Sequence, residues 1–464
     1  MANSRKRPPS DLAERVLREL ERHVQPQARV TLALSGGVDS IVLLDLLARV
    51  APRHPFALEC LHVNHRISPN APAWARFARD AAKRYGLRCW VKRVDLARYR
   101  SLGLEGAARA ARYEVFARAQ ADFIALAQHQ DDQAETVLLQ LVRGAGVTGL
   151  AAMPAVRSQP KGGPQLLRPL IGATRAEITA YARATGLEWI EDESNDDERL
   201  ARNFVRRRVV PLLHELNPQA CANLARSAAH LAEASELAQA LGALDVRGAA
   251  RDGRLSVAAL SELPRARAKN ALRWHLASAG LGAPTSAHTE EMLDQILNAR
   301  DDAAIRFVFE GGEVRRFRGL VWIVPRRDGL RRDFRARWTG ERTWHLPELG
   351  GVMRFVPTRG GGLSRRTLAG KTVEVRVRKG GERIRPNLGR PSRPLKSLLQ
   401  EAAIPPWERE RLPLLYCGRR LAFVPGIGVE ASLAAKPGEA GVAISWQPLA
   451  VGTVLNRGAE RGQC

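Results

Sequence analysis

The chain has 464 residues, 45% of them hydrophobic, and at roughly 100 to 200 residues per domain this length predicts about two to four domains. Lysine and arginine total 73 against 48 aspartate and glutamate residues, a formal net charge of +25 at pH 7. This excess favours a polyanionic partner. An arginine-rich protein without such a partner is the alternative.

Cysteine spacing and hydropathy exclude several classes of protein. The five cysteines stand singly, so no CxxC pair is available for zinc, an iron–sulfur cluster or a dithiol redox centre. A reducing cytoplasm fits this pattern best. The basic N-terminus lacks an apolar stretch behind it, and no segment approaches roughly 18 consecutive apolar residues, so we expect a cytoplasmic protein without membrane contact.

The first predicted elements are a helix, a strand, a glycine turn and a second helix. A helical apolar pattern starts at Asp11, a plausible N-cap, and precedes an apolar run over 30–34. The sequence SGGVDS interrupts this run, and a helical pattern resumes over 41–50.

The same alternation of strands and helices continues to residue 142. Strands are predicted over 56–63, 88–94 and 123–127, and helices over 73–85, 107–119 and 133–142. Repeated units of this kind predict an α/β fold with a parallel, doubly wound sheet, Rossmann-like, covered by helices on both faces. Ligands of such sheets bind at the carboxyl ends of the strands.

The composition of the sequence changes near residue 218, where alanine- and leucine-rich helical patterns replace the alternation of strands and helices. Short β-rich runs follow beyond residue 301, and a third module starts near residue 371. We therefore predict an α/β domain over 1–217, a mainly helical domain over 218–335, a linker over 336–370, a small α+β C-terminal domain over 371–450 and a flexible tail over 451–464.

The loop SGGVDS has the features of a phosphate-binding turn. Backbone N–H groups and a helix N-terminus can surround a phosphate there, and the glycines allow close approach. Asp39 is predicted to bind Mg²⁺, since an acid that faces a polyphosphate requires a cation between them. No lysine follows, which excludes a Walker A motif. An ordinary strand-to-helix turn is the alternative. The predicted nucleotide-binding residues are Ser35, Gly36, Gly37, Val38, Asp39 and Ser40.

Two further polar groups follow the ends of predicted strands. The sequence HVNH over 62–65 ends the second strand, and AQHQDDQAE brings His129, Asp131, Asp132 and Glu135 to a strand-to-helix junction. Three carboxylates and a histidine at the edge that carries the phosphate loop indicate chemistry. Each has a structural alternative, because acids in a first helical turn serve as caps, Glu135 could lie on the helix surface and a histidine at a strand end could be solvated.

These motifs carry a resemblance. SGGVDS resembles the signature of the N-type ATP pyrophosphatases (PP-loop superfamily), which split ATP between its α and β phosphates. With Glu105, Arg109, Arg112, Tyr113 and EDESNDDERLARNFVRRRVVPLL over 191–213, the ordered set is similar to the tRNA(Ile)-lysidine synthase family. VRKGGERIRP and PLKSLLQEAAIPPWERERLPLLY resemble the C-terminal domain of the family's longer members.

The resemblance implies a ligase whose substrates are ATP, L-lysine and the tRNA(Ile) with a CAU anticodon. In this family the carbonyl oxygen of the first anticodon cytidine attacks the α-phosphate of ATP and releases pyrophosphate. The lysine ε-amine then attacks the adenylated ring, AMP leaves and lysidine is formed. A homodimer is plausible from the family, and the domains after the first would bind tRNA.

The resemblance also implies roles for individual residues. Arg112 and Arg202 would stabilise charge near the transferring group, although an arginine on a helix commonly pairs with solvent or an acid. Asp132 or His129 would accept the lysine proton, and we favour Asp132. Family members often have two adjacent histidines before the paired aspartates, whereas this chain has Gln128 in the first position. Arg66 is also less typical in its place.

Basic residues elsewhere could contact RNA phosphates. They form three groups: Arg206, Arg207 and Arg208; Arg315, Arg316, Arg326, Arg327, Arg331 and Arg332; and Arg378, Lys379, Arg383, Arg385, Arg393 and Lys396. Trp407 could offer a stacking surface, although a core position is the stronger alternative. Phosphate contacts do not select one tRNA.

Three other functions are consistent with parts of the sequence. A sulfur-transferring tRNA enzyme of the same superfamily would require a cysteine pair or cluster ligands, and an amidotransferase ligase would require a glutaminase domain or an N-terminal cysteine nucleophile. A tRNA-binding protein without activity would explain the charge but not SGGVDS.

Overall fold

The computed structural model falls into two compact units, Met1–Leu237 and Ala238–Cys464, which are described separately. The structure describes residues 9–159, 162–191, 193, 197–251, 254–282, 284–300, 305–309, 311–326, 329–331 and 333–448. The tail predicted over 451–464 and Asn195, Arg327 and Arg332 lie outside these residues.

The first unit is built on a six-stranded sheet with the order β3-β2-β1-β4-β6-β5. Neighbouring strands are parallel except β5, which pairs antiparallel with β6. The predicted parallel α/β sheet is therefore confirmed, with one antiparallel strand at its edge. The strands are β1 (Arg29–Ala33), β2 (Ala57–Asn64), β3 (Cys89–Arg93), β4 (Phe123–Ala125), β5 (Val156–Arg157) and β6 (Gln165–Leu167).

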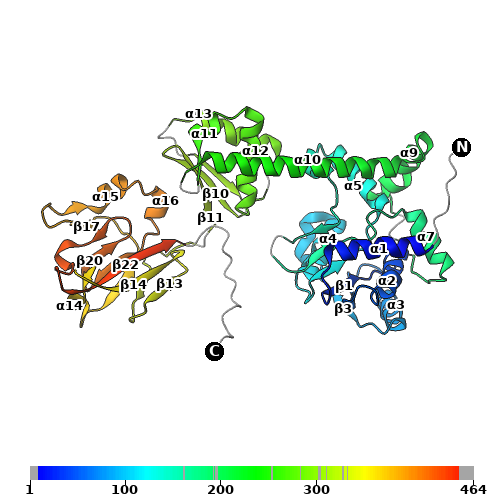
Figure 1. Cartoon of the computed structure of the whole chain (residues 1–464), viewed down its shortest axis with the longest axis horizontal. Coiled ribbons are helices and arrows are strands. Elements are labelled where there is room, and N and C mark those ends of the chain that lie inside the picture. The colour runs from blue at the N-terminus through cyan, green and yellow to red at the C-terminus, as the bar shows by residue number, and fades with distance from the viewer. Residues whose placement is uncertain are drawn as a thin grey trace. The chain divides into compact units, whose positions relative to one another are not determined.

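Helices cover both faces of this sheet (Figure 1). On one face, α1 (Pro9–His23), α2 (Val38–Val50), α3 (Ala71–Arg84) and α7 (Arg175–Ala184) contribute to the main core. On the other face, Phe116 of α4 (Gly103–Ala117) packs against Leu61, Ile124 and Leu166. The helix α2 is apolar on nearly all sides because it lies between the sheet and other helices.

The remaining elements of this unit are short helices and α5, which lie between or after the strands in the chain. They are η1 (Ala97–Leu102), α5 (Gln130–Val142), α6 (Val147–Leu150), α8 (Ala201–Phe204), the π-helical turn η3 (Val205–Val209) and α9 (Val210–Leu216). The helix α10 (Ala220–Ala249) begins in the first unit and ends in the second.

The second unit starts with helices and an antiparallel sheet that share one core. Its helices are α11 (Val257–Ser261), α12 (Arg265–Ser278) and α13 (Ser286–Asn298). The sheet has the order β7-β8-β11-β10-β9, with β7 (Ala250–Arg251), β8 (Arg254–Ser256), β9 (Arg306–Phe309), β10 (Gly312–Phe317) and β11 (Leu320–Pro325). The described residues of the region predicted to be mainly helical thus also include the strands β7 to β11.

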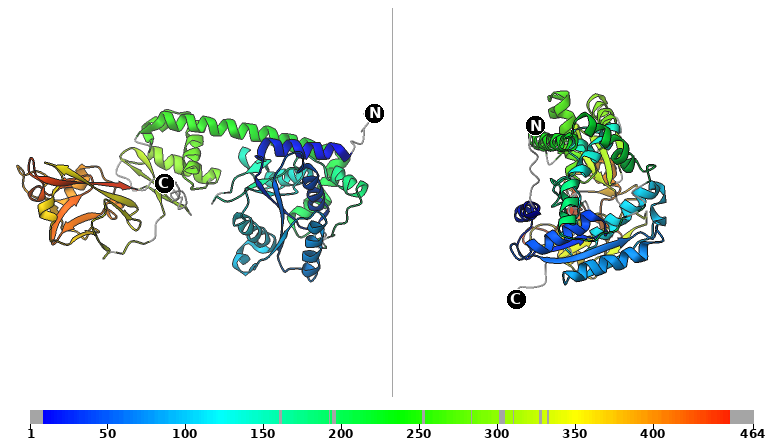
Figure 2. Two further views of the ribbon diagram at one scale, coloured as in Figure 1. Left: turned by 60° about the horizontal axis from the view of Figure 1, so that its bottom comes forward. Right: turned by 90° about the vertical axis from the view of Figure 1, so that its right-hand side faces the viewer.

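Small sheets with mainly antiparallel pairing form the C-terminal part (Figure 2). One has the order β12-β16-β19-β20-β21 and another β13-β14-β22-β15, while β17 and β18 form a pair. Their bounds are β12 (Arg335–Arg337), β13 (Thr343–Leu346), β14 (Gly351–Arg359), β15 (Leu363–Ser364), β16 (Val373–Arg376), β17 (Arg383–Ile384), β18 (Arg393–Pro394), β19 (Leu414–Cys417), β20 (Arg420–Val424), β21 (Gly428–Val429) and β22 (Ala440–Pro448). The short helices are α14 (Arg365–Leu368), α15 (Leu395–Glu401), α16 (Pro406–Arg409) and η4 (Ala431–Leu433).

The segment 336–370, expected to be a linker, is part of this fold. Its strand β14 pairs with β22 along nine residues, and Met353 and Phe355 are buried in the C-terminal core. Alternating buried residues along β14 explain why the segment forms a strand.

Candidate active site

The phosphate loop links the carboxyl end of β1 to the N-terminus of α2. The Ser40 hydroxyl lies 3.0 Å from the Ser35 hydroxyl and donates to the Gly37 carbonyl at 2.9 Å, while the Gly36 N–H donates to Ser40 Oγ at 3.1 Å. The helix begins at Val38, three residues earlier than predicted, because Gly37 serves as its N-cap. Asp39 and Ser40 therefore lie in the first helical turn, where backbone N–H groups have no helical acceptor.

Gly36 occupies a position that only glycine fits well. Its φ is +98°, and a Cβ built on it would lie 2.9 Å from Cδ1 of Ile190. The Gly36 carbonyl also accepts the Ile190 N–H at 2.9 Å, so the loop is fixed from behind by the segment after α7. The backbone is thus held in the conformation that a phosphate would approach.

His129 lies at the centre of the predicted acid cluster and is 1% exposed. Its Nε2 is 3.7 Å from Asp39 Oδ2 and 3.6 Å from Asp132 Oδ2, and its Nδ1 is 3.6 Å from Asp131 Oδ2. Burial alone lowers the pKa of His129, but the nearby carboxylates of Asp131, Asp39 and Asp132 outweigh burial and raise it to about 10. The fold therefore brings Asp39, His129 and Asp132 together.

Arg202 and Arg206 flank Glu135 on the same side of α5. Arg202 Nε donates to Glu135 Oε2 at 2.8 Å, and Arg206 Nε donates to Glu135 Oε1 at 2.6 Å. Both guanidinium groups also contact Asp132 Oδ1, at 3.4 and 3.2 Å. Glu135 is 2% exposed, so its alternative position on the helix surface is excluded. Arg206, expected to contact RNA, is paired with Glu135 and keeps 27% of its side chain exposed.

Arg112 lies on α4, exposed to solvent, and has no ion pair with a described carboxylate. Desolvation of its guanidinium by neighbouring protein atoms lowers its pKa even though the residue as a whole is exposed, and the charges of Arg109 and Arg202 act in the same direction. Burial and the charge of Arg112 lower the pKa of His65 to about 4. Arg112 is therefore an electrostatic neighbour of Arg202 and His65, although it does not join the acid cluster by hydrogen bonds.

Gln128 is the acceptor for a buried arginine, Arg168, that no sequence motif marks. Arg168, which follows β6 and is 1% exposed, donates from Nε to Gln128 Oε1 at 2.5 Å and from Nη1 to the Pro154 carbonyl at 2.7 Å. The residue next to His129 is thus tied to the end of β6. A single arginine between Leu167 and Pro169 gives no sequence signal for this role.

The histidines after β2 have different environments. His62 is 5% exposed and its Nδ1 lies 2.9 Å from the Leu34 carbonyl, which makes it structural. His65 instead lines a cavity of about 540 Å³ with Arg66, Ile67, Arg100 and Leu104, beside the carboxyl ends of β2 and β3. Arg66 has a φ of +57°, so the loop turns sharply at this point.

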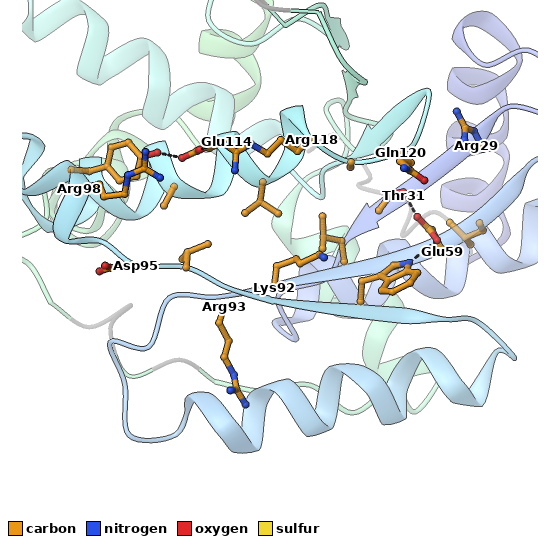
Figure 3. Close-up of a pocket in the computed structure, with 18 of the residues that line it drawn as sticks. Arg29, Thr31, Glu59, Lys92, Arg93, Asp95, Arg98, Glu114, Arg118 and Gln120 are labelled. Carbon is orange, nitrogen blue, oxygen red and sulfur yellow. Dashed lines mark hydrogen bonds and ion pairs between the residues drawn. The ribbon is translucent and has the colours of Figure 1, made fainter.

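A larger cavity of about 830 Å³ lies on the sheet face beneath α4 (Figure 3). At one end of this cavity Glu59 accepts hydrogen bonds from the Thr31 hydroxyl at 3.0 Å and from Trp90 Nε1 at 2.9 Å. Lys92 points into it, whereas Arg93 points away (Figure 3). None of the predicted site residues lines this cavity, so its size does not make it the reaction site.

The residues of the phosphate loop fit a Mg²⁺ ion. Asp39 Oδ1 is buried without a hydrogen-bond partner. Within the described part of the chain, no group of three or more His, Cys, Asp or Glu side chains is arranged to hold a metal by itself. Magnesium commonly takes one or two protein carboxylates and completes its shell with phosphates and water, so a single orphan carboxylate oxygen beside a phosphate loop suits it.

The basic residues predicted to bind RNA in the second unit are partly paired. Arg315 contacts Glu313, and Arg331 pairs with Asp333. Trp407 is half-buried, with its ring centroid 5.8 Å from those of Phe317 and Trp322 and the Arg315 guanidinium 4.9 Å from its own. Trp407 therefore packs against other aromatic side chains, as the core alternative predicted, more than it offers an open stacking surface.

Comparison with known families matches three parts of the chain. A model described as PP-loop domain covers residues 10–213, one described as TilS substrate binding domain covers 255–322, and one described as TilS substrate C-terminal domain covers 373–446. The PP-loop match implies that the chain uses ATP. Within the described residues, no helix combines the length and apolar character needed to cross a membrane.

Relatives match the chain from end to end. The tRNA(Ile)-lysidine synthase of Nitrosomonas europaea is 40% identical over 456 residues, 98% of this chain and 99% of the relative. The chain belongs to the tRNA(Ile)-lysidine synthase family. Enzymes of that name from Azoarcus sp. and Coxiella burnetii are 41% and 35% identical, covering 92% and 90% of this chain and 93% of each relative. The family predicted from the ordered motifs is thus confirmed.

Proposed function

We propose that this chain ligates free L-lysine to the cytidine at the first anticodon position of a tRNA(Ile) with a CAU anticodon. ATP is converted to AMP and pyrophosphate through an adenylated tRNA intermediate. The observation that carries this proposal is the meeting of the phosphate loop with the His129 acid cluster, in a chain that matches tRNA(Ile)-lysidine synthases along nearly all its length.

Adenylation would take place at the loop after β1. Residues 35–40 would hold the β- and γ-phosphates through backbone N–H groups and the hydroxyls of Ser35 and Ser40. Asp39 would hold Mg²⁺, which offsets the charge of the leaving pyrophosphate when bound. The cytidine carbonyl oxygen then forms its bond to the α-phosphorus as the bond to pyrophosphate breaks.

Ligation would follow at the adenylated ring carbon. The lysine ε-ammonium must lose a proton before its nitrogen can attack, and we assign Asp132 as the acceptor. Its Oδ2 accepts the His129 backbone N–H at 3.1 Å and its Oδ1 faces Arg202 and Arg206, so its carboxylate is held in one orientation. The nitrogen–carbon bond forms, and AMP leaves with the former cytidine oxygen.

The other predicted residues would support these two steps. His129 contacts three carboxylates and would keep Asp39 and Asp132 at a fixed separation. Arg112 carries a positive charge without a carboxylate partner near Arg202, which suits it to stabilise the developing phosphate charge. The charge of Arg202 is neutralised by its ion pair with Glu135, so Arg202 would mainly orient Asp132.

A sulfur-transfer reaction finds little support in the cysteines. Cys60 and Cys89 are cross-strand neighbours on β2 and β3, and both are free. Burial raises the pKa of Cys60 to about 12 and that of Cys89 to about 11, so both are thiols at neutral pH. A thiol at this pKa is a poor nucleophile, which favours lysine over sulfide as the second substrate.

The finer assignments form part of the same proposal. We expect residues 218–335 and 371–450 to bind the tRNA, a homodimer as the quaternary state and the cytoplasm, where tRNA and ATP are found, as the location. The cysteines within the described residues are all free, which suits that reducing compartment. Sedimentation of the purified chain would measure the oligomeric state.

The test is a ligation assay with ATP, Mg²⁺, labelled lysine and a tRNA(Ile) transcript with a CAU anticodon. We expect label in the anticodon nucleoside, lost in Asp39→Asn. Label that is absent with lysine but present with a sulfur donor would assign the chain to thiolation instead. Pyrophosphate release that requires tRNA would separate an enzyme from an RNA-binding protein.

A further inference from the structure

Three arginines surround Tyr113 on the first unit. Arg109 lies one helical turn before Tyr113 on α4, and its guanidinium carbon is 5.0 Å from the Tyr113 ring centroid. The guanidinium carbon of Arg157, from β5, is 5.5 Å from the same centroid. Arg109 Nη2 also donates to the Tyr113 hydroxyl at 3.4 Å. Arg168 lies behind them, hydrogen-bonded to Gln128 and the Pro154 carbonyl.

This cluster carries charge that the protein does not neutralise. In the part of the chain that the structure describes, Arg109, Arg157 and Arg168 have no carboxylate partner within 4.0 Å. By contrast, Arg118, the C-cap of the same helix, pairs with Glu114, and Arg202 and Arg206 pair with Glu135. Burial, reinforced by the charges of Arg157 and Arg109, lowers the pKa of Arg168 to about 10. Grouping cations in this way costs free energy that a bound anion would recover.

The exposed members are suited to a phosphate. Arg109 and Arg157 are open to solvent, and their planar guanidinium groups can each donate two hydrogen bonds to phosphate oxygens. Cation–π contact with the Tyr113 ring limits the rotation of both guanidinium groups. Such preorganisation reduces the side-chain entropy lost on binding.

We propose that Arg109 and Arg157, assembled around Tyr113, bind a backbone phosphate of the RNA substrate beside the ATP site; this rests on the proposed function. ATP has its own loop after β1, whereas the cluster belongs to α4, β5 and the end of β6, the latter two on the far side of β4 from β1. Arg112, an electrostatic neighbour of both Arg109 and Arg202, connects the cluster to the acid cluster. A nucleotide whose base reaches the phosphate loop would place its flanking phosphate along the path that runs from the acid cluster through Arg112 to Arg109 and Arg157.

The test compares tRNA binding by full-length variants over a series of KCl concentrations. Each phosphate contact on a single strand contributes about 0.7 to the slope of log affinity against log salt, so losing this one phosphate contact in Arg109→Ala with Arg157→Ala should lower the slope by about 0.7. At physiological salt the affinity should fall about tenfold. The matched control is Arg76→Ala with Arg183→Ala, which replaces two exposed arginines on α3 and α7 that form no ion pair with a described carboxylate, and it should keep the wild-type slope.

Two further measurements make the result specific. Arg109→Lys with Arg157→Lys should recover most of the slope, because the charges remain. ATP binding measured without RNA should be the same in the alanine variant as in the control. An unchanged slope in the alanine variant would overturn the proposal, and so would weaker ATP binding with an unchanged slope, since the cluster would then serve ATP. If the wild-type chain makes no lysidine while the slope still falls, the proposed function fails and the phosphate site stands.

Discussion

At the scale of single residues, Gly36 and Gly37 stand side by side in the phosphate loop but differ in what they tolerate. A Cβ at Gly36 would require a left-handed backbone and meet Ile190, whereas Gly37 has a φ of −71° and its Cβ would meet only Ser35 Oγ at 3.6 Å. Placing alanine in the left-handed region costs about 1–2 kcal/mol, which the loop can relieve by moving.

We therefore expect Gly36→Ala to weaken ATP binding about tenfold, while Gly37→Ala stays much closer to wild type. Titration with a fluorescent ATP analogue measures both. Equal losses in the two variants would show that backbone access to the phosphates, rather than the conformation of Gly36, sets the affinity.

Gln128 allows a second test at this scale. Gln128→Leu would leave Arg168 Nε without its acceptor in a buried position, at a cost of about 2 kcal/mol in the free energy of unfolding. Gln128→His, the residue usual in the family, retains a ring nitrogen that can accept, and should cost less than half as much. Urea unfolding measures both, and equal losses would mean that the Arg168 contact contributes little.

The sequence predicted some residues of the site well and others poorly, depending on whether their partners lie nearby in the chain. The phosphate loop and the acids before α5 are contiguous in the chain, so local pattern and the family resemblance were enough. Arg168 and Glu135 act through partners 40 or more positions away, as Arg168 does with Gln128 and Glu135 with Arg202 and Arg206. No local pattern carries such pairings.

At the scale of elements, Glu135 ties α5 to α8 and η3. Glu135→Gln keeps the shape but removes the charge between Arg202 and Arg206, so the free energy of unfolding should fall by about 1–3 kcal/mol. The control is Glu198→Gln, whose partner Arg208 is 66% exposed, and it should cost less than about 1 kcal/mol. Chemical denaturation compares the two, and a similar small loss in both would contradict a structural role for the Glu135 pair.

The elements themselves were predicted to within a few residues where the pattern was strong. Strands β1 to β4 and helices α2 to α5 all lie at or next to their predicted ranges. Starts were the weak point: α2, α4 and α5 begin three to four residues before the predicted position because polar residues and glycine form their first turns. Strands β5 and β6 have only two and three residues, too few for an alternation to be visible.

At the scale of the whole molecule, the sequence showed the change in composition near residue 218 but not the strands of the region that follows. Helices α10 to α13 produce the alanine- and leucine-rich pattern. The short strands that complete their core pair with segments far along the chain, as β8 does with β11. The segment 336–370 was predicted to be a linker because its glycines obscure the strand β14. The partner of β14, β22, lies about 90 residues later in the chain.

The separate cores of the two units lead to a last prediction. Residues buried in the first unit and those buried in the second form distinct clusters, so each unit should unfold in its own transition. ATP with Mg²⁺ binds the first unit alone in the proposed mechanism, and at a hundred times its dissociation constant a ligand stabilises its domain by about 2.7 kcal/mol. Calorimetry should therefore show one transition that rises with ATP and one that does not, and Gly36→Ala should reduce the rise at the same ATP concentration. A single transition, or equal shifts in both, would mean that binding at the phosphate loop is coupled to the fold of the second unit.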